Sequence, residues 1–396
     1  MKVAVVAHFF PPEPCAAATR VKSLVDALAA DGHDVTVVTP FPSFPQGRFA
    51  PSDRGKLRRT QQQGRVRVVQ LFSLLAHGIP AARLVHWGTS ALAATIYLTC
   101  TRRRYDLVVA SMPPITLAVP ALLAAWRHRS RLVVDVRDVF PDIAIAMGEW
   151  RRDGILARAS EWLVRRLYRR ADLIVAVTPT AIAQIATRGV DPARLILARN
   201  AAEEIPACVR SPGGARGFTA IYAGNLGLAT DLDVLVDAAV LVAGDGIAID
   251  IVGDGAQRTH LEDRLRNERV GNVNISGSLA RPAAMQRLAD ADVAIVPLRK
   301  GIEESVPTKL YDALSVGCPV IVAADGEARI EGASLGAACT PPGDAPALAD
   351  ALRRLHALDR SALRALGDDG RARISQRAGR AGIMTELSGR ISALAS

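Results

Sequence analysis

Short, strongly apolar runs alternate with longer segments of helical periodicity along the whole chain. The runs are rich in Val, Ile and Ala, which is typical of strands that are buried on both faces of a parallel sheet. In the first half they lie at residues 3–9, 34–40, 67–71, 106–111, 131–138 and 172–178. They resume at residues 218–224, 247–255, 273–277, 292–298 and 319–325. This α/β alternation predicts two Rossmann-like, doubly wound domains.

A segment without this alternation separates the two sets of strands. Residues 199–217, RNAAEEIPACVRSPGGARG, are rich in Gly, Pro and Ala, which is typical of a linker. We therefore predict an N-terminal domain over residues 1–200 and a C-terminal domain over residues 201–377, facing each other across a cleft. A final amphipathic helix is predicted near 371–394, and its last part, about 378–396, is expected to pack back on the first domain.

Composition favours a globular protein of the cytoplasm. Hydrophobic residues make up 49% of the chain and charged residues 22%. The first residues, MKVAVVAHFF, resemble a buried strand rather than a secretory signal. The longest nearly apolar run, residues 90–100, is shorter than the roughly 20 residues that span a bilayer. The five cysteines have no C-x-x-C spacing, so neither a disulfide framework nor a metal site is predicted.

The net charge of +10 is unevenly distributed. Residues 1–200 carry 28 basic and 14 acidic residues, whereas residues 201–396 carry 21 and 25. The basic half suits an acidic partner such as an anionic membrane surface or a phosphorylated substrate. Nucleic acid is disfavoured because aromatic residues do not alternate with the arginines. A plain solvated basic surface remains the alternative.

Glycine-rich turns follow two strands of the second half. GNLG places Gly224, Asn225 and Gly227 after one strand, and VGDG places Gly253 after the next. Because such turns expose backbone N–H groups at the carboxyl edge of a sheet, they can hold a phosphate. Glycine required for turn geometry alone is the simpler alternative.

The segment VPLRKGIEESVPTKLYD, residues 296–312, carries most of the chemistry of the second half. Lys309 opens a short helix, although a helix N-terminus disfavours a cation. With Arg299 nearby, it suits a bound diphosphate, and Asp312 one turn later suits a pair of sugar hydroxyls. An exposed ion pair between Lys309 and Asp312 is the alternative.

Charged residues also follow a strand of the first half. Arg137 and Asp138 end the run RLVVDVRD and are candidates for acid/base work or for contacts with an acceptor. His8 ends the first strand, and Arg20 closes EPCAAATR, which opens the next helix. We expect both to face the acceptor. A surface pair of Arg137 and Asp138, and a structural histidine, are the alternatives.

The chain resembles bacterial family 4 glycosyltransferases of the GT-B fold, in particular those that build exopolysaccharide and O-antigen. The resemblance rests on motifs that occur in family order over nearly the whole length. They are AHFFPPEP, GHDVTVVTPFPSFPQG, DLVVASMPP, VVDVRDVFPD, YAGNLGLATDLDVLVDAA, IVGDG and PTKLYDALSVGCPVI. It implies a retaining enzyme that needs no metal or cofactor. A nucleotide-diphosphate sugar, expected to be a UDP-sugar, would bind the C-terminal domain.

The resemblance also implies roles for individual residues. Asp312 stands where the family binds ribose, and Glu304 stands near the donor sugar. Lys309, Leu310 and the turn from Gly224 to Gly227 match the surroundings of the diphosphate. Ser278 and Leu279 match the stretch that lines the base. Arg137 or Asp138 matches the strand end that faces the reacting carbon, and a glycan, lipid-linked molecule or small molecule is the expected acceptor.

Three departures from the family pattern accompany these assignments. Asp312 replaces the usual glutamate, Asn225 replaces an arginine, and EPCAAA replaces a more glycine-rich loop.

Two other classes of protein remain as alternatives to a glycosyltransferase. A sugar-nucleotide 2-epimerase shares the fold but needs clustered carboxylates and histidines, and a non-catalytic protein that binds lipid or nucleic acid would explain only the basic half.

Overall fold

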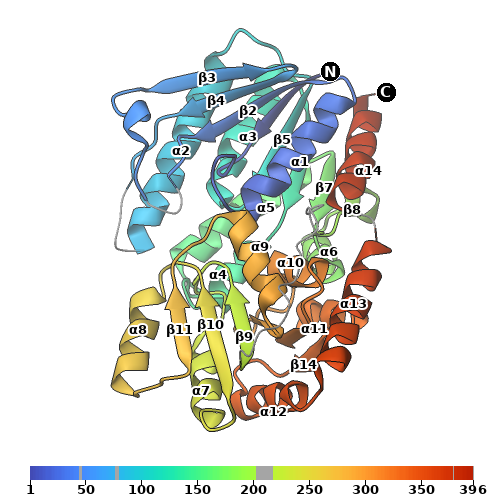
Figure 1. Cartoon of the computed structure of the whole chain (residues 1–396). Helices are drawn as coiled ribbons and strands as arrows, with labels where there is room; N and C mark the ends of the chain where they lie inside the picture. The colour runs from blue at the N-terminus through green and yellow to red at the C-terminus, as the bar shows by residue number, and fades with distance from the viewer. Residues whose placement is uncertain (44–46, 76–79, 202–216, 378, 396) are drawn as a thin grey trace. The chain divides into compact units, whose positions relative to one another are not determined.

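The apolar runs form the strands of two separate sheets in a computed structural model of the chain (Figure 1). It describes residues 1–43, 47–75, 80–201, 217–377 and 379–395. The chain divides into two compact units, one of residues 1–199 with 380–396 and one of residues 200–379. The boundary lies within a few residues of the one predicted from the sequence. Most of the predicted linker, residues 202–216, lies outside the described part of the chain.

The N-terminal unit contains an eight-stranded sheet of order β3-β4-β2-β1-β5-β6-β7-β8. All neighbouring strands are parallel except β3, which pairs with β4 in the antiparallel sense. The strands are β1 (Lys2–Val6), β2 (Asp34–Pro40), β3 (Arg58–Gln63), β4 (Val66–Leu71), β5 (Leu107–Met112), β6 (Arg131–Val136), β7 (Leu173–Ala176) and β8 (Leu195–Leu197). Its central strands are buried, as their unbroken apolar sequences require.

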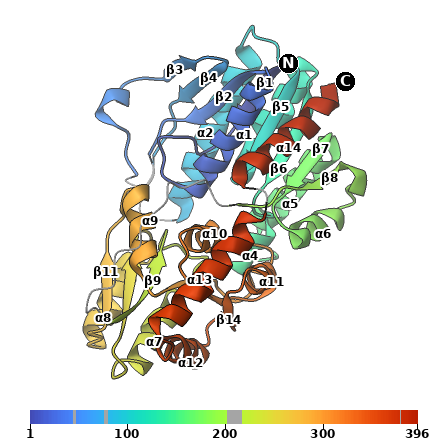
Figure 2. The same ribbon diagram turned by 45° about the vertical axis from the view of Figure 1, so that its right-hand side comes forward.

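Helices cover this sheet. They are α1 (Ala16–Ala30), α2 (Pro80–Cys100), α3 (Ala118–His128), α4 (Asp142–Ala146), α5 (Ile155–Arg170) and α6 (Pro179–Ala186), followed at the end of the chain by α14 (Arg380–Ser392). α14 lies beside α1 (Figure 2) and buries Met384, Leu387 and Ile391 in the core that α1 shares with the sheet. The expectation that the last helix packs on the first unit is confirmed.

The C-terminal unit is built on a six-stranded, wholly parallel sheet of order β11-β10-β9-β12-β13-β14. The strands are β9 (Phe218–Ala223), β10 (Ile247–Val252), β11 (Val273–Ser276), β12 (Val293–Pro297), β13 (Val320–Ala323) and β14 (Ala338–Thr340). The helices are α7 (Asp233–Leu241), α8 (Arg258–Asn267), α9 (Arg281–Asp290), α10 (Thr308–Ser315), α11 (Gly326–Ser334), α12 (Ala345–His356) and α13 (Arg360–Ser375). The prediction of two doubly wound α/β domains is confirmed.

The prediction differs from the structure in two respects. The helix expected at 371–394 is two helices, α13 and α14, which belong to different units. Three short strands, β3, β8 and β14, were not predicted, and β3 has the wholly polar sequence RRTQQQ at the sheet edge. Within the part of the chain that is described, no helix is long and apolar enough to cross a bilayer.

Candidate functional site

The two glycine turns of the C-terminal unit lie against each other. β9 and β10 are neighbours, so the loops that follow them leave the same edge of the sheet. The Gly224 amide donates to Val252 O at 2.9 Å, and the Leu226 amide donates to Asp254 O at 2.9 Å. The Gln257 amide in turn donates to Leu226 O at 3.0 Å. These bonds join the turns into one rigid edge.

Glycine at position 253 is required by close approach. Gly253 has φ +151°, and a Cβ there would lie 1.9 Å from Gly224 O, well inside van der Waals contact. A Cβ at Gly224, which has φ +153°, would lie 3.3 Å from Lys309 Nζ. The missing side chains of both glycines therefore leave room for a neighbouring group, the Gly224 carbonyl in one case and the Lys309 ammonium in the other. The geometry of a turn alone does not require this room.

Lys309 lies over this edge from the first turn of α10. Its Nζ donates to the Tyr222 hydroxyl at 2.6 Å and lies 4.0 Å from the centroid of the Tyr222 ring. The same hydroxyl donates to Asn225 O at 2.6 Å. The ammonium group is thus held beside the GNLG turn by Tyr222.

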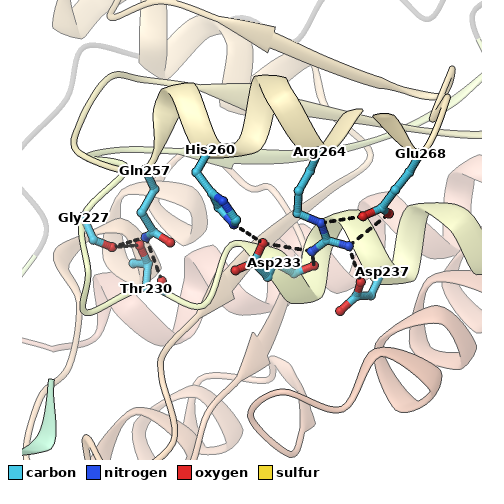
Figure 3. A network of polar contacts seen from close by, with 8 residues as sticks. All are labelled: Gly227, Thr230, Asp233, Asp237, Gln257, His260, Arg264 and Glu268. Atoms are coloured by element: carbon cyan, nitrogen blue, oxygen red, sulfur yellow. Dashed lines mark hydrogen bonds and ion pairs between the residues drawn. The ribbon is translucent and has the colours of Figure 1, made fainter. Parts of the chain in front are cut away.

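A polar network fixes the elements that follow the two turns (Figure 3). The Gln257 side-chain amide, at the start of α8, donates to Gly227 O at 2.5 Å and to Thr230 O at 3.1 Å. Further along α8, Arg264 pairs with Asp233 at 2.8 Å and with Asp237 at 2.7 Å, both on α7. α7 and α8 are therefore tied together directly behind the turns.

The loop between β12 and α10 approaches the same edge. The Arg299 amide donates to Ala229 O at 3.0 Å, and the Arg299 side chain is exposed. Further on, Glu304 is 4% exposed. The loop is anchored at Glu303, whose carbonyl accepts from the Glu327 amide at 2.8 Å. Gly326 permits this contact, because a Cβ there would lie 2.3 Å from Glu303 O.

Asp312 pairs with an arginine that the sequence analysis did not single out. Arg281, the first residue of α9, contacts its two carboxylate oxygens at 3.0 and 3.5 Å. Ser278 and Leu279 are exposed in the loop between β11 and α9. Leu310 is fully buried, so its side chain belongs to the core. These placements do not test ligand binding, and the donor assignments stay predictions.

In the N-terminal unit, Arg20 is part of a buried ion pair. Its Nη2 lies 2.8 Å from Asp135 Oδ1, and its Nε donates to both carboxylate oxygens of Asp135. The side chains are 5% and 2% exposed. The Arg20 Nη1 also donates to Arg199 O at 3.4 Å. This fork joins α1 to β6, which gives Arg20 a structural role whether or not an acceptor also contacts it.

Arg137 and Asp138 follow β6 at the carboxyl edge of the N-terminal sheet. The Arg137 guanidinium donates to Met112 O at 3.0 Å and to Pro113 O at 2.8 Å. Burial raises the pKa of the Asp138 carboxyl above its usual range, an effect that Arg137 partly offsets. Burial also lowers the pKa of Arg137. A carboxyl with a raised pKa is suited to proton transfer.

His8 lies next to the same edge and is almost fully buried. Burial, His86 and Arg137 together lower the pKa of His8 to about 3, so its ring is neutral at pH 7. Its Nδ1 lies 3.5 Å from Ser90 Oγ, and its ring lies 4.8 Å from that of His86. A neutral ring in this place can donate or accept a hydrogen bond but cannot supply charge.

A pocket of about 640 Å³ opens in the N-terminal unit beyond β1 and β2. It is lined by Pro12, Glu13, Pro14, Pro42, Ser43, Arg48, Phe49, Ala50, Pro51 and Arg54. Glu13 accepts from the Ser43 amide at 3.0 Å and so joins the loops on its two sides. The two arginines give the pocket a basic wall.

Sequence reasoning missed Tyr222, Gln257 and Arg281. A tyrosine in a buried strand directly before a glycine turn is a usable signal, because its hydroxyl needs a polar partner. Gln257 and Arg281 gave no such signal, since their contacts depend on how loops from different strands fold together.

Comparison with known proteins identifies both units. Residues 16–201 match the model of the Glycosyl transferase 4-like domain, and residues 217–357 match that of Glycosyl transferases group 1. "Probable glycosyltransferase WbjE" of Pseudomonas aeruginosa is 27% identical over 290 residues, which are 69% of this chain and 72% of that protein. The "GDP-mannose-dependent alpha-mannosyltransferase" of Mycolicibacterium smegmatis is 28% identical over 83% of this chain and 81% of its own length.

Solved structures share the fold. The structure of Anabaena HepE in complex with UDP-glucose superposes with a TM-score of 0.70 at 18% identity, covering 99% of this chain and 100% of that one. The two α/β units with parallel sheets are those of the GT-B fold. The chain therefore belongs to the glycosyltransferases, with a 4-like domain followed by a group 1 domain, and it is a transferase enzyme.

Proposed function

We propose that the enzyme is a retaining glycosyltransferase that moves a sugar from a UDP-sugar to a hydroxyl of a glycan, a lipid-linked molecule or a small molecule. Within the family shown above, this proposal adds the donor, the stereochemistry and the acceptor class. The observation that supports the proposal most strongly is the position of the Lys309 ammonium group, which is held above the joined glycine turns.

A diphosphate fits this edge for electrostatic reasons. The turns bring backbone groups close to any ligand because Gly224 and Gly253 have no side chain, and Lys309 and Arg299 supply positive charge. The departing nucleoside diphosphate gains negative charge in the transition state. Fixed cations therefore stabilise the transition state more strongly than they stabilise the bound donor. We propose that these cations make a metal unnecessary, with Asp312 near the ribose and Glu304 near the donor sugar.

The acceptor is proposed to bind the N-terminal unit. Arg137 and Asp138 would face the reacting carbon, with Asp138 suited to proton transfer by its raised pKa. His8 and Arg20 would support this region rather than bind an acceptor through charge, because one is neutral and the other is paired with Asp135. The basic pocket that contains Arg48 and Arg54 suits an acceptor with a phosphate group.

UDP is the proposed nucleotide because the Anabaena protein of the same fold was solved with UDP-glucose. The name of the Mycolicibacterium relative specifies GDP-mannose, so GDP-sugars belong in any panel. Titration calorimetry with UDP, GDP and CDP tests the choice, and tighter binding of GDP than of UDP would overturn it.

The activity test is incubation with radiolabelled UDP-sugars and an extract of lipid-linked acceptors. Label that enters the lipid fraction supports transfer to such an acceptor. Label that enters a soluble glycan supports transfer and identifies a glycan, rather than a lipid-linked molecule, as the acceptor. Isomerised nucleotide sugar, or no turnover of any nucleotide sugar, would contradict the proposal.

Two finer points need their own measurements. Proton NMR of the product should give the same anomeric configuration as the donor, and inversion would exclude retention. EDTA should leave the rate unchanged, and a loss that Mg²⁺ restores would exclude independence from metal. Fractionation of cells is expected to find the protein in the cytoplasm, in part on the inner membrane surface.

A further inference from the structure

Three helices of the N-terminal unit expose an unusual amount of apolar surface. α2 packs against α3, and α3 packs against α5. Large apolar side chains on these helices are between 39% and 84% exposed, namely Val85, Leu92, Ile96, Val119, Leu123, Trp126, Ile155, Leu156 and Trp162. We call these nine residues and the arginines between them the α2–α3–α5 surface. Exposed patches of this kind in a soluble chain mark interaction sites.

The helices on the other side of this unit look different. α1 and α14 pack on each other and share a core with Val3, Val5 and Val109, to which α2, α3 and α5 contribute no residue. In the described residues of α1 and α14, no large apolar side chain is among the exposed ones. The apolar exposure is therefore a property of one side of the unit rather than of its helices in general.

Basic residues predominate on the α2–α3–α5 surface, although Glu149 and Asp172, which lie outside the three helices, pair with Arg83 and Arg170. The three helices together contain seven arginines, no lysine and a single acid, Glu161. Glu161 already pairs with Arg165 at 2.6 Å and with Arg188 at 3.0 Å. The guanidinium of Arg166 lies 5.1 Å from the centroid of the Trp162 ring, so cation and aromatic ring are presented together.

A pocket of about 460 Å³ lies on this surface. It is lined by Leu122, Ala125, Trp126, Arg129 and Arg170. Trp126 is 76% exposed, and Arg170 is held in place by Ser130 O at 2.8 Å and by Asp172 at 3.2 Å. Two arginines beside an exposed indole suit a phosphate group whose apolar remainder lies against the ring.

The geometry points to an anionic lipid membrane as the occupant of the α2–α3–α5 surface. Tryptophan and arginine together are typical of proteins that lie at the boundary between headgroups and acyl chains, where each finds both an apolar and a polar environment. Arginines next to exposed aliphatic side chains add attraction to anionic headgroups. The pocket beside Trp126 takes the phosphate of one headgroup.

A second copy of the chain fits this surface less well. A two-fold dimer uses the same patch on both subunits, so the seven arginines of one copy would face those of the other, although Glu149, Glu161 and Asp172 pair with three of them on each side. A lipid surface brings the opposite charge instead. None of the residues of the α2–α3–α5 surface belongs to the proposed donor site, so the inference stands apart from the choice of donor.

Sedimentation of the full chain with lipid vesicles tests the inference. The protein should bind vesicles of phosphatidylcholine that contain phosphatidylglycerol, should bind pure phosphatidylcholine far more weakly, and should be released by added salt. The double variant Arg165→Gln with Arg166→Gln should lower the partition coefficient about 30-fold, equivalent to ~2 kcal/mol. The double variant Trp126→Ala with Trp162→Ala should lower it by at least tenfold.

Matched controls remove the same groups elsewhere. Arg364→Gln with Arg390→Gln removes two exposed charges, and Ile330→Ala removes a 65% exposed apolar side chain. These variants should bind anionic vesicles like the unchanged protein, and circular dichroism should show that all variants are folded. The inference is overturned if anionic vesicles are not bound, if both vesicle types bind equally, or if the controls lose as much binding. Light scattering that finds a dimer abolished by the tryptophan variant would assign the surface to a second copy instead.

Discussion

Replacement of Lys309 by alanine removes the ammonium group above the glycine turns and leaves the rest of that edge intact. In the structure this group touches the Tyr222 hydroxyl at 2.6 Å and lies 4.0 Å from its ring centroid. Tyr222 keeps its bond to Asn225 O after the change. Because Lys309 is only half-buried, the free energy of unfolding should fall by less than about 1 kcal/mol.

The effect on the donor should be much larger than the effect on stability. A hydrogen bond from a charged group contributes about 1.5–3 kcal/mol, so UDP should bind roughly tenfold to 150-fold more weakly. The transition state carries more negative charge on the leaving diphosphate than the bound donor does. We therefore expect kcat/KM to fall by about 10²–10³-fold, which exceeds the loss in affinity.

Calorimetry with UDP and initial rates with the radiolabelled donor measure the two effects. Lys309→Arg, which keeps the charge, should lose less than Lys309→Ala. Lys22→Ala is the control, because it removes an exposed lysine of the other unit whose ammonium group pairs with Asp26 on the same helix. It should change neither quantity.

The reasoning is refuted if folded Lys309→Ala binds UDP and turns over the donor as the unchanged enzyme does. A loss of affinity with an equal loss of kcat/KM would refute only the claim that the ammonium favours the transition state. A large fall in melting temperature would mean that Lys309 stabilises the fold through Tyr222.

Four other changes have defined outcomes. Gly253→Ala should destabilise the protein by roughly 3 kcal/mol or more in urea unfolding, through backbone overlap and its positive φ, whereas Gly244→Ala, which has open space, should not. Asp312→Asn should raise the donor KM severalfold, and an unchanged KM would remove it from the ribose. Arg20→Met should cost about 3–5 kcal/mol in the same unfolding assay, because it leaves its buried carboxylate partner charged and unpaired. For His8 the unfolded chain takes up a proton below pH 6.5 and the folded chain does so only near pH 3, so stability falls as pH decreases. His8→Gln should reduce the loss of unfolding free energy between pH 6.5 and pH 5 by about 2 kcal/mol. A pH profile of stability that the variant leaves unchanged would contradict that pKa.

The arrangement of strands was predictable because burial on both faces leaves a continuous apolar run. β1, β5 and β6 carry such runs, and each was placed within a few residues. β3 was missed because an edge strand needs no apolar side chains, so RRTQQQ has no pattern to detect. The prediction of a single helix at 371–394 was wrong for another reason. The helical periodicity of the sequence continues through the short break between α13 and α14 and so does not mark it.

For the candidate site, the sequence located residues but could not pair them. Lys309 and Asp312 are one turn apart, and an ion pair between them was the simplest alternative. The structure gives each a different partner, Tyr222 for the lysine and Arg281 for the aspartate. Both partners come from other strand ends, so their contacts depend on long-range packing that local spacing does not contain.

The return of α14 to the N-terminal unit determines when that unit can finish folding. Met384, Leu387 and Ile391 fill the core beside α1. The end of α14 is joined to the loop after α1 by a contact of 2.7 Å between Ser392 Oγ and His33 Nε2. During synthesis the ribosome must make the whole C-terminal unit before these residues emerge. Until then the face of α1 that α14 covers lacks its partner, so we expect an N-terminal fragment without α14 to aggregate more readily than the full chain. The first unit to be made is the last to be completed.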